Sequence, residues 1–478
     1  MRRNSISHFL SKKTKEMASN LFQDDVVVLM VPFPLQGHLN QLLHLSRLIS
    51  SRGVSVHYVG TATHNRQARR RAQGWDPISA SNIFFHEFQS LHFTAPPPDP
   101  SAAIKFPGHL QPLFDTLHSL RRPVADLLAS LSASRRRVVV VYDSLMGSVV
   151  QDFVNFPNAE SYIFHSVSAY TIFFFLWETS GRPFAVDPEI LSGLPALEGC
   201  FTPEFLKFVV KQHQYLKLNS GRIYNTCREV EGPFLDLLQR PHISGAKKQW
   251  ALGPFNPIAS PKRKKPPHKC LQWLDGQPRD SVILVSFGTT TTLSNDQIHH
   301  LATGLERSGQ KFLWVLRDAD TGDVFRAAAG RRAQLPQGFE ERITGTGLVV
   351  RDWAPQLDIL GHSATGGFMS HCGWNSCMES MSMGKPIAAW PMHSDQPRNT
   401  VLIARVLGIG LVVRDWARRA EVVKADVVED AVRRLMASEE GEAMRKRAAE
   451  LGRAVRDAAE EGGSACFELD CFVSHISR

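Results

Sequence analysis

Cysteine is scarce in this chain of 478 residues, which holds only seven thiols. They are Cys200, Cys227, Cys270, Cys372, Cys377, Cys466 and Cys471. Their number is odd, and no pair has the close spacing of a zinc knuckle, so the sequence indicates neither a disulfide framework nor a zinc module. Reduced thiols are typical of the cytosol, and we therefore expect a cytoplasmic protein.

The chain also lacks a long, clean apolar run and a concentrated basic surface. The stretch 162–177 is the most apolar, but His165, Ser166 and Ser168 interrupt it, so no integral membrane segment is expected. The net charge is +9, yet the basic residues come in short, scattered groups without interleaved aromatic residues. A solvated basic surface explains this pattern, and we expect no nucleic-acid partner.

What the chain does contain is an alternation of apolar strands and helices. Val26–Val31 is a continuous apolar run, as expected of a buried parallel strand, and leucines at helical spacing follow in 40–51. Further strands are expected at 54–59, 138–142, 282–287, 312–316, 347–350, 367–370 and 386–390, with a helix starting at Asn295. Because the alternation occurs in two blocks, and the length is large for one core, two doubly wound α/β domains are predicted.

The strand expected at 367–370 leads into a turn and a helix with many hydrogen-bond donors. Gly373 allows close approach of a ligand to the backbone, and the unpaired N–H groups of a helix start favour an anion. The side chains of His371, Asn375 and Ser376 can add further donors. A diphosphate fits these groups, at the edge of the sheet where α/β proteins bind ligands.

Four further residues of the segment 353–396 complete a set of groups that suits a sugar nucleotide. Trp353 can stack on a base, and Glu379 lies one helical turn after Ser376, where it can accept hydrogen bonds from ribose hydroxyls. Asp395 and Gln396 can hold sugar hydroxyls. Each residue alone is equally compatible with a core position, a helix cap or a solvated face, and only their order and spacing together indicate this function.

A second candidate site lies near the amino end. His38 follows the first strand at the start of a helix, and a histidine there can accept a proton at neutral pH. Asp143 ends the strand expected at 138–142 and can orient the imidazole from the same sheet edge. From the residues alone, a structural helix-start histidine is an equally good interpretation. The first strand is not followed by G-x-G-x-x-G, which argues against a nicotinamide dehydrogenase.

The segment WAPQLDILGHSATGGFMSHCGWNSCMESMSMGKPIAAWPMHSDQ resembles the signature of plant family 1 UDP-dependent glycosyltransferases, and the likeness extends over nearly all of 26–473. The resemblance implies a hexosyltransferase with a GT-B fold, in which two Rossmann-like domains face each other across a cleft. It implies His38 as general base and Asp143 as its partner. It places the donor at Ser286, Gly288, Thr289, Trp353, Ala354, Gln356, His371, Gly373, Trp374, Asn375, Ser376, Glu379, Asp395 and Gln396.

Within that set the resemblance also implies individual contacts. Trp353 would stack on uracil, Gln356 would bind the uracil–ribose end and Glu379 the ribose, while Trp374, Asp395 and Gln396 would contact the sugar. Gln396 favours glucose, and xylose to a lesser degree, over galactose. UDP-glucose is then a co-substrate, and no cofactor or metal is expected. The triplet Asp318-Ala319-Asp320 is interpreted as a solvated loop rather than a metal-binding D-x-D motif.

The amino-acid sequence of the segments 37–71, 138–152 and 390–407 resembles that of zeatin O-glucosyltransferases, particularly the cis-zeatin type of cereals. The resemblance implies an inverting transfer of glucose to the side-chain hydroxyl of a cytokinin, cis-zeatin first. Flavonoids or other small plant phenols and alcohols are the alternative acceptors, and a catalytically silent UDP-sugar-binding protein is a further alternative. The acceptor-pocket candidates are Phe88, Phe93, Phe173 and Phe174. A monomer is expected.

The predicted domain boundaries follow the composition. A flexible amino-terminal extension covers 1–24, where a weak likeness to a transit peptide and an alternative start at Met17 are both open. An acceptor-binding domain spans 25–257, a proline-rich basic linker 258–268 and a UDP-sugar-binding domain 269–455. The last residues, 456–478, are expected to form a helix that packs back on the first domain.

Overall fold

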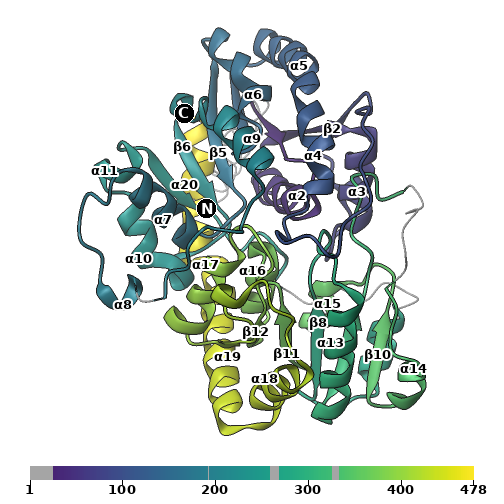
Figure 1. Cartoon of the computed structure of the whole chain (residues 1–478). Coiled ribbons are helices and arrows are strands. Elements are labelled where there is room, and N and C mark those ends of the chain that lie inside the picture. Colours follow the sequence, from purple (N-terminus) through teal and green to yellow (C-terminus); the bar gives the residue numbers. More distant parts are fainter. Residues whose placement is uncertain (1–24, 192, 259–267, 326–332) are drawn as a thin grey trace, which may run out of the picture.

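The computed structural model describes residues 25–191, 193–258, 268–325 and 333–478. It contains two parallel β-sheets, one from each half of the chain, and each sheet is flanked by helices (Figure 1). The predicted extension 1–24 and nearly all of the predicted linker 258–268 lie outside the described residues.

The first sheet has seven strands in the order β3-β2-β1-β4-β5-β6-β7. Its strands are β1 (Val26–Val31), β2 (Ser55–Thr61), β3 (Ile83–Phe88), β4 (Arg137–Asp143), β5 (Ala159–His165), β6 (Gly221–Tyr224) and β7 (Lys248–Ala251). The strand predicted at 26–31 is confirmed to the residue. β1 pairs with β2 on one side and β4 on the other, with Val31 opposite Tyr142. The carboxyl ends of β1 and β4 therefore lie side by side.

The second sheet has six strands in the order β10-β9-β8-β11-β12-β13. Its strands are β8 (Val282–Ser286), β9 (Lys311–Val315), β10 (Gly347–Val350), β11 (Thr365–Ser370), β12 (Ile387–Ala389) and β13 (Gly410–Val412). The strand predicted at 386–390 is shorter, because only Ile387–Ala389 pairs with its neighbours β11 and β13.

Nineteen α-helices connect or cover these strands in the described part of the chain. In the first half they are α2 (Gln36–Ser50), α3 (Ala62–Arg71), α4 (Gln111–Thr116), α5 (Arg121–Ser134), α6 (Gly147–Val150), α7 (Ala169–Thr179), α8 (Pro188–Leu191), α9 (Pro203–His213), α10 (Arg228–Leu238) and α11 (Pro241–Ser244). In the second half they are α12 (Lys269–Asp275), α13 (Asn295–Ser308), α14 (Phe339–Arg342), α15 (Gln356–Leu360), α16 (Trp374–Ser382), α17 (Gln396–Val401), α18 (Ala425–Ala437), α19 (Glu439–Ala459) and α20 (Ser464–Ile476). The helix predicted at 40–51 begins earlier, at Gln36, so His38 lies in its first turn.

β1 is apolar throughout because both faces of its sheet are covered. Val26, Val28 and Met30 contribute to one hydrophobic cluster, together with α2 and α20. Val27, Leu29 and Val31 contribute to a second cluster on the opposite face, with α4 and α5. Alternate side chains of a strand point to opposite faces, so a strand buried on both sides needs a continuous apolar run. This burial fixes the position of the loop that follows Val31.

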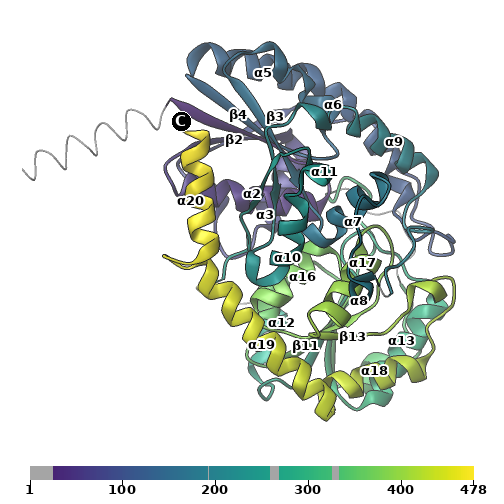
Figure 2. The ribbon, with the colours of Figure 1, turned by 90° about the vertical axis from the view of Figure 1, so that its left-hand side faces the viewer.

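The carboxyl-terminal helices return the chain from the second half to the first (Figure 2). α19 packs on α16 and α18, and α20 then packs on β7. Phe472 of α20 has no exposed surface and makes edge-to-face contacts with Tyr162 and Trp250. The exact domain boundaries stay a prediction.

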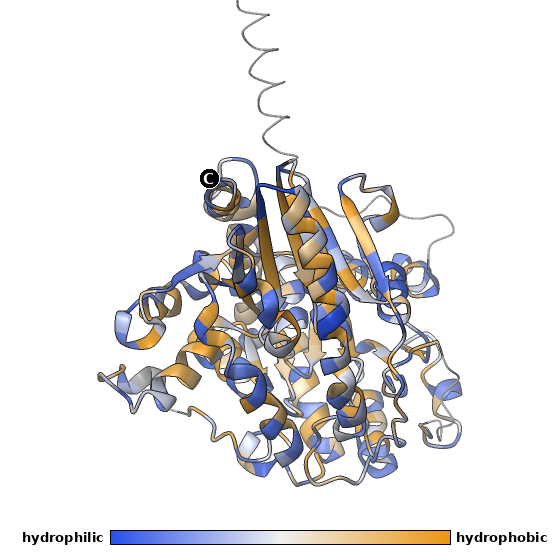
Figure 3. Ribbon diagram, turned by 90° about the horizontal axis from the view of Figure 1, so that it is seen from above, coloured by the Kyte–Doolittle hydropathy of each residue, from blue (hydrophilic) through white to orange (hydrophobic). Residues whose placement is uncertain are grey.

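Hydrophobic residues concentrate along the strands, whereas the surrounding helices mix polar and apolar residues (Figure 3). Among the described residues, no helix combines the length and the apolar character needed to cross a membrane.

Candidate active site

His38 and Asp143 form a hydrogen-bonded pair at the carboxyl edge of the first sheet. His38 Nδ1 lies 2.7 Å from Asp143 Oδ2, and the Asp143 side chain is fully buried whereas that of His38 is 20% exposed. Asp143 ends β4, and its other oxygen, Oδ1, accepts the backbone N–H of Leu145 at 3.0 Å. The structure thus brings together the two residues that the sequence placed on neighbouring strand ends.

This geometry suits general base catalysis. When the proton of the neutral ring is on Nδ1, it is donated to Asp143, and Nε2 is left as an acceptor. The buried carboxylate can also stabilise the imidazolium that forms when Nε2 takes a proton. Phe33 packs beside the ring, with centroids 5.1 Å apart, and limits its movement. The pair therefore has a fixed orientation and one ring edge open to a substrate.

The second sheet supplies a polar cradle around the start of α16. The imidazole of His371 lies between two glycines. A Cβ atom on Gly288 would come 2.7 Å from Nε2, and one on Gly373 would come 2.5 Å from it. His371 Nδ1 is buried and has no hydrogen-bond partner within the described chain. Burial lowers the pKa of His371 to about 4, so the ring is neutral and can donate one N–H to a ligand.

Glu379 lies one turn further along α16 and is held by two amide side chains. It accepts Gln356 Nε2 at 2.7 Å and Asn375 Nδ2 at 2.8 Å, and Gln356 Nε2 also lies 3.0 Å from Ser376 Oγ. Burial raises the pKa of Glu379 to about 7, against the opposing effect of the two amides. The structure thus gathers Gln356, Asn375, Ser376 and Glu379, four of the predicted donor-binding residues, into one network.

Asp395 and Gln396 follow β12 and face the first half of the chain. Asp395 accepts Asn399 Nδ2 at 2.6 Å. Burial raises the pKa of Asp395 to about 6, while the Asn399 hydrogen bond and the charge of His38 lower it. Asn399 in turn accepts Ser168 Oγ of the first half at 2.7 Å, which places Asp395 next to the boundary between the two halves. Gln396 Oε1 accepts the backbone N–H groups of Met392 and His393, and its Nε2 lies 3.3 Å from His393 Nδ1, so both ends of this amide have partners within the loop after β12.

The remaining predicted donor residues occupy the edge of the same sheet. Ser286 ends β8, and Gly288 and Thr289 follow it, with Gly288 in the left-handed region at φ 81°. Trp353 and Ala354 lie in the loop between β10 and α15. The indole Nε1 of Trp374 donates to the backbone oxygen of Asn225 in the first half at 2.9 Å, and the contact of Trp374 with the sugar stays a prediction.

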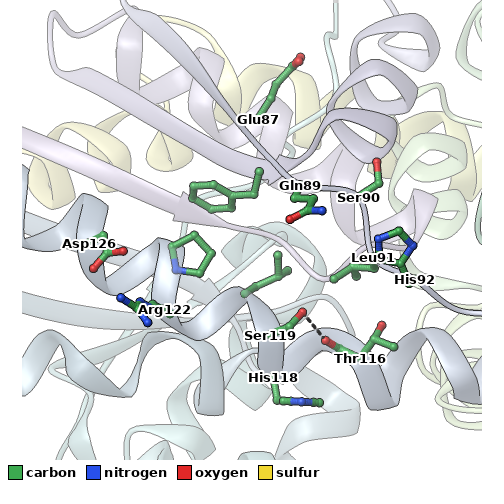
Figure 4. Close-up of a pocket in the computed structure, with 13 residues that line it drawn as sticks. Glu87, Gln89, Ser90, Leu91, His92, Thr116, His118, Ser119, Arg122 and Asp126 are labelled. Carbon is green, nitrogen blue, oxygen red and sulfur yellow. Dashed lines mark hydrogen bonds between the residues drawn. The ribbon is translucent and has the colours of Figure 1, made fainter.

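The four predicted acceptor-pocket residues do not form one pocket. Phe173 and Phe174 are fully buried and pack against Phe234 or Tyr170 in the core. Phe93 lies against Gly322 of the second half. Phe88 lines a cavity of about 690 Å³, which opens between the end of β3 and the start of α5 (Figure 4). His38 and Asp143 do not line this cavity, and its lining is mixed in charge.

A group of phenylalanines that the sequence analysis did not single out links the catalytic pair to the second half. The group consists of Phe33, Phe106, Phe114, Phe201, Phe205 and Phe208. Phe106 reaches across to the ring of His393, with centroids 5.6 Å apart. Phe205 and Phe208 lie three residues apart on one face of α9, and Phe201 just precedes the helix, so the spacing of these three residues was the available signal for this group.

The D-x-D triplet was interpreted as a solvated loop, and this interpretation is wrong for Asp320. Asp318 is exposed, but the Asp320 carboxylate is largely buried and pairs with Arg71 of the first half at 2.7 Å. A buried carboxylate needs a partner, and here a cation fills that role. In the described part of the chain, no group of three or more His, Cys, Asp or Glu residues could hold a metal ion.

Comparison with known proteins agrees with this geometry. The chain matches the family model for the amino-terminal domain of glycosyltransferases over 24–257 and the model for UDP-glucuronosyl and UDP-glucosyl transferases over 255–446. In fold it is similar to a UDP-glucosyltransferase from Polygonum tinctorium capable of glucosylating indoxyl, with a TM-score of 0.75 and 27% identity over 95% of this chain and 99% of that one. This similarity confirms the predicted GT-B fold.

Three curated relatives match nearly the whole chain. A zeatin O-glucosyltransferase of Phaseolus lunatus is 54% identical over 95% of this chain and 97% of its own length. A zeatin O-xylosyltransferase of Phaseolus vulgaris is 52% identical over 95% and 98%. Cis-zeatin O-glucosyltransferase 2 of Zea mays is 44% identical over 95% and 99%. With two matching domain models and relatives of this length and identity, the chain belongs to the family of UDP-dependent glycosyltransferases and is an enzyme of that class.

Proposed function

We propose that this enzyme transfers glucose from UDP-glucose to the side-chain hydroxyl of zeatin, with inversion at the anomeric carbon. The observation that carries the proposal is the His38–Asp143 pair, held at 2.7 Å beside a phenylalanine group that reaches His393 of the donor half. A base on one side of a cleft and a sugar-binding carboxylate on the other are the two groups that a direct displacement needs.

In the proposed reaction, His38 Nε2 takes the proton of the acceptor hydroxyl as its oxygen attacks the anomeric carbon. The new C–O bond forms on the face opposite UDP, and the bond to the diphosphate oxygen breaks, so the α-linked sugar becomes a β-glucoside. Asp143 stabilises the imidazolium. The backbone N–H groups at the start of α16, together with His371, stabilise the negative charge on the departing UDP.

The support for a zeatin acceptor comes from the relatives and from the phenylalanine group beside His38. Three relatives with names that specify zeatin share 44–54% of their residues with this chain. Aromatic walls suit a planar base such as the purine of a cytokinin. The identity is higher to the two bean proteins than to the maize cis-zeatin enzyme, so trans-zeatin enters the test beside cis-zeatin, the preferred acceptor.

The test is incubation with UDP-glucose and a panel of cis-zeatin, trans-zeatin, dihydrozeatin and several flavonols, with products identified by mass and by the configuration of the anomeric proton. We expect β-O-glucosides of zeatin. Flavonol glucosides without a zeatin product would contradict the proposed acceptor. An α-linked product would contradict the inverting mechanism.

A second candidate donor is UDP-xylose, because a relative with the name zeatin O-xylosyltransferase is 52% identical. Gln396 is compatible with both sugars, which differ only at C6. Competition between equal concentrations of UDP-glucose and UDP-xylose, with trans- and cis-zeatin as acceptors, distinguishes the two by product mass. We expect the glucoside to dominate. A monomeric state and a cytoplasmic location stay predictions.

A further inference from the structure

The loop after β9, residues 316–325, crosses from the donor half of the enzyme to the helices of the first sheet. Asp320 of this loop accepts two hydrogen bonds from Arg71, at 2.7 Å from Nη1 and 3.3 Å from Nη2. The two side chains are only 9% and 11% exposed. Arg317 of the same loop donates to Asp320 Oδ1 at 3.0 Å. The pair is therefore a largely buried ionic contact between the two halves.

On the donor side, Asp320 is hydrogen-bonded to the loop that follows β8, residues 287–292, which we call the phosphate-side loop. Its backbone N–H donates to the backbone oxygen of Thr289 at 2.7 Å. Thr289 follows Gly288, which packs against the imidazole of His371. A displacement of Asp320 would therefore move the loop that limits one side of the diphosphate site.

On the catalytic side, Arg71 is tied to the start of α2. Its Nη1 also donates to Gln36 Oε1 at 3.3 Å, and Gln67 Nε2 donates to the same oxygen at 3.0 Å. Gln36 is the first residue of α2, two residues before His38. A continuous series of hydrogen bonds thus connects Thr289 of the donor half to the helix turn that carries the base.

Two histidines of the first half hold the backbone of the same loop. His109 Nε2 lies 3.0 Å from the oxygen of Asp320, and His64 Nε2 lies 3.3 Å from the oxygen of Gly322. Burial lowers the pKa of His64 to about 4, so this ring is neutral and donates from Nε2. The loop is therefore fixed by its backbone as well as by its carboxylate, and removal of one side chain leaves the other contacts in place.

We propose that Arg71 and Asp320 are positioning residues. They hold the phosphate-side loop and the first turn of α2, which carries His38, in a fixed relative position across the cleft. The proposal rests on the proposed function, in which His38 must face the anomeric carbon of a bound UDP-sugar. Misplacement of reacting groups by about 1 Å can lower a rate by about a hundredfold. The pair acts through Thr289 and Gln36 and is not expected to touch either substrate.

The first experiment compares Arg71→Ala, Asp320→Ala and the double variant with the wild-type enzyme. For each we would measure kcat, KM for both substrates, the Kd of UDP by calorimetry and the melting temperature. We expect kcat to fall at least about tenfold, with the Kd of UDP within about threefold of the wild-type value. The double variant should be no worse than the poorer single variant, because both changes break one contact. Arg71→Lys should restore part of kcat.

Arg69→Gln is the matched control. Arg69 lies on the same helix, α3, and pairs with Glu87 at 2.5 Å, but this ion pair lies within the first half of the chain. The kcat of Arg69→Gln should stay within about twofold of the wild-type value, because a surface ion pair contributes little. A purely structural role of Arg71 and Asp320 would lower the melting temperature and leave kcat unchanged at a temperature where the variants are folded, and that result would overturn the proposal.

Amide hydrogen exchange supplies a measurement that is independent of turnover. In Asp320→Ala, exchange should become faster in 287–292 and in 36–43, on both sides of the cleft, whereas Arg69→Gln should change neither segment. Faster exchange on one side alone would overturn the proposed coupling. If the wild-type enzyme transfers no sugar to zeatin or flavonols, the proposed function fails, and the exchange result still decides whether the pair couples the two halves.

Discussion

The proposed donor and acceptor sites are built from opposite kinds of chemical group. The donor half buries titratable groups. His371, Glu379 and Asp395 all have pKa values shifted by burial, and amide side chains hold both carboxyl groups. The acceptor half instead places one catalytic pair beside a group of phenylalanines. Polar networks fix one ligand geometry, whereas aromatic walls accept related shapes, so we expect the donor half to specify one nucleotide and the acceptor half to leave room for variation.

Substitution of the proposed base, His38, should have the largest effect on kcat. It should also distinguish the role of the acceptor half from that of the donor half most clearly. We expect His38→Ala to lower kcat by about a hundred- to ten-thousandfold, because general base catalysis contributes about that much. UDP-glucose should still bind with wild-type affinity, since His38 belongs to the acceptor half. Initial rates with zeatin and calorimetric titration with UDP-glucose check both statements. A variant that keeps the full rate would exclude His38 as the base.

Glu379 gives the donor half a pH dependence. Burial raises the pKa of Glu379 to about 7, and two ribose hydroxyls require the ionised form as acceptor. UDP-glucose affinity should therefore increase as the pH rises through about 7, by about tenfold between pH 6 and pH 8. UDP-glucose is the suitable probe because its diphosphate does not titrate in this range. In Glu379→Gln the affinity should be lower and should change much less between pH 6 and pH 8, leaving only the contribution of Asp395, whose pKa burial raises to about 6; an unchanged slope would assign the titration to another group.

The raised pKa of Glu379 also predicts in which direction the free energy of unfolding changes with pH. Because the pKa of Glu379 is raised in the folded state, the native protein binds a proton that the unfolded chain releases between about pH 4.5 and pH 7. The free energy of unfolding should therefore decrease as the pH rises through this window, and Glu379→Gln should remove that loss. Denaturant unfolding of the wild-type enzyme and of Glu379→Gln at pH 5 and pH 8 measures this change in the free energy of unfolding.

Glycine substitutions can test the packing around His371. In Gly288→Ala the new methyl group would lie 2.7 Å from His371 Nε2, and we expect KM for UDP-glucose to rise about tenfold with little change in KM for the acceptor. Gly309→Ala is the control, because Gly309 also has a positive φ, 68°, but no atom lies within 4 Å of the new Cβ. Both variants should lose stability, and only the first should lose donor affinity. If Gly288→Ala and Gly309→Ala have the same KM for UDP-glucose, the contact with His371 is unimportant for donor binding.

The smallest effect is expected in the acceptor half. In Phe106→Leu the ring that contacts His393 and Phe205 is lost, while a buried apolar side chain remains. We expect KM for zeatin to rise about threefold, and the ratio of cis- to trans-zeatin turnover to change, with KM for UDP-glucose unchanged. An equal rise in both KM values would indicate that the phenylalanine group supports the donor half as well.

The donor half could be predicted from the sequence because its residues are local. Segment 353–396 carries most of them on consecutive strand ends and helix starts, and the fold of such a βα unit follows from its apolar periodicity. The acceptor half depends on contacts between distant residues. Phe33 meets Phe208, and Phe106 meets Phe205 and His393, only after the chain has folded, and the spacing of the phenylalanines around α9 does not reveal these partners. Asp320 was misread for the same reason, because its partner Arg71 is 249 residues away.

The path of the chain through the molecule has a mechanical consequence. The polypeptide passes from the first half to the second between β7 and α12, and returns between α19 and α20, which packs on β7. Because α20 packs on β7, the last helix of the chain fastens the second half to the first sheet, in addition to the side-chain contacts between the two halves.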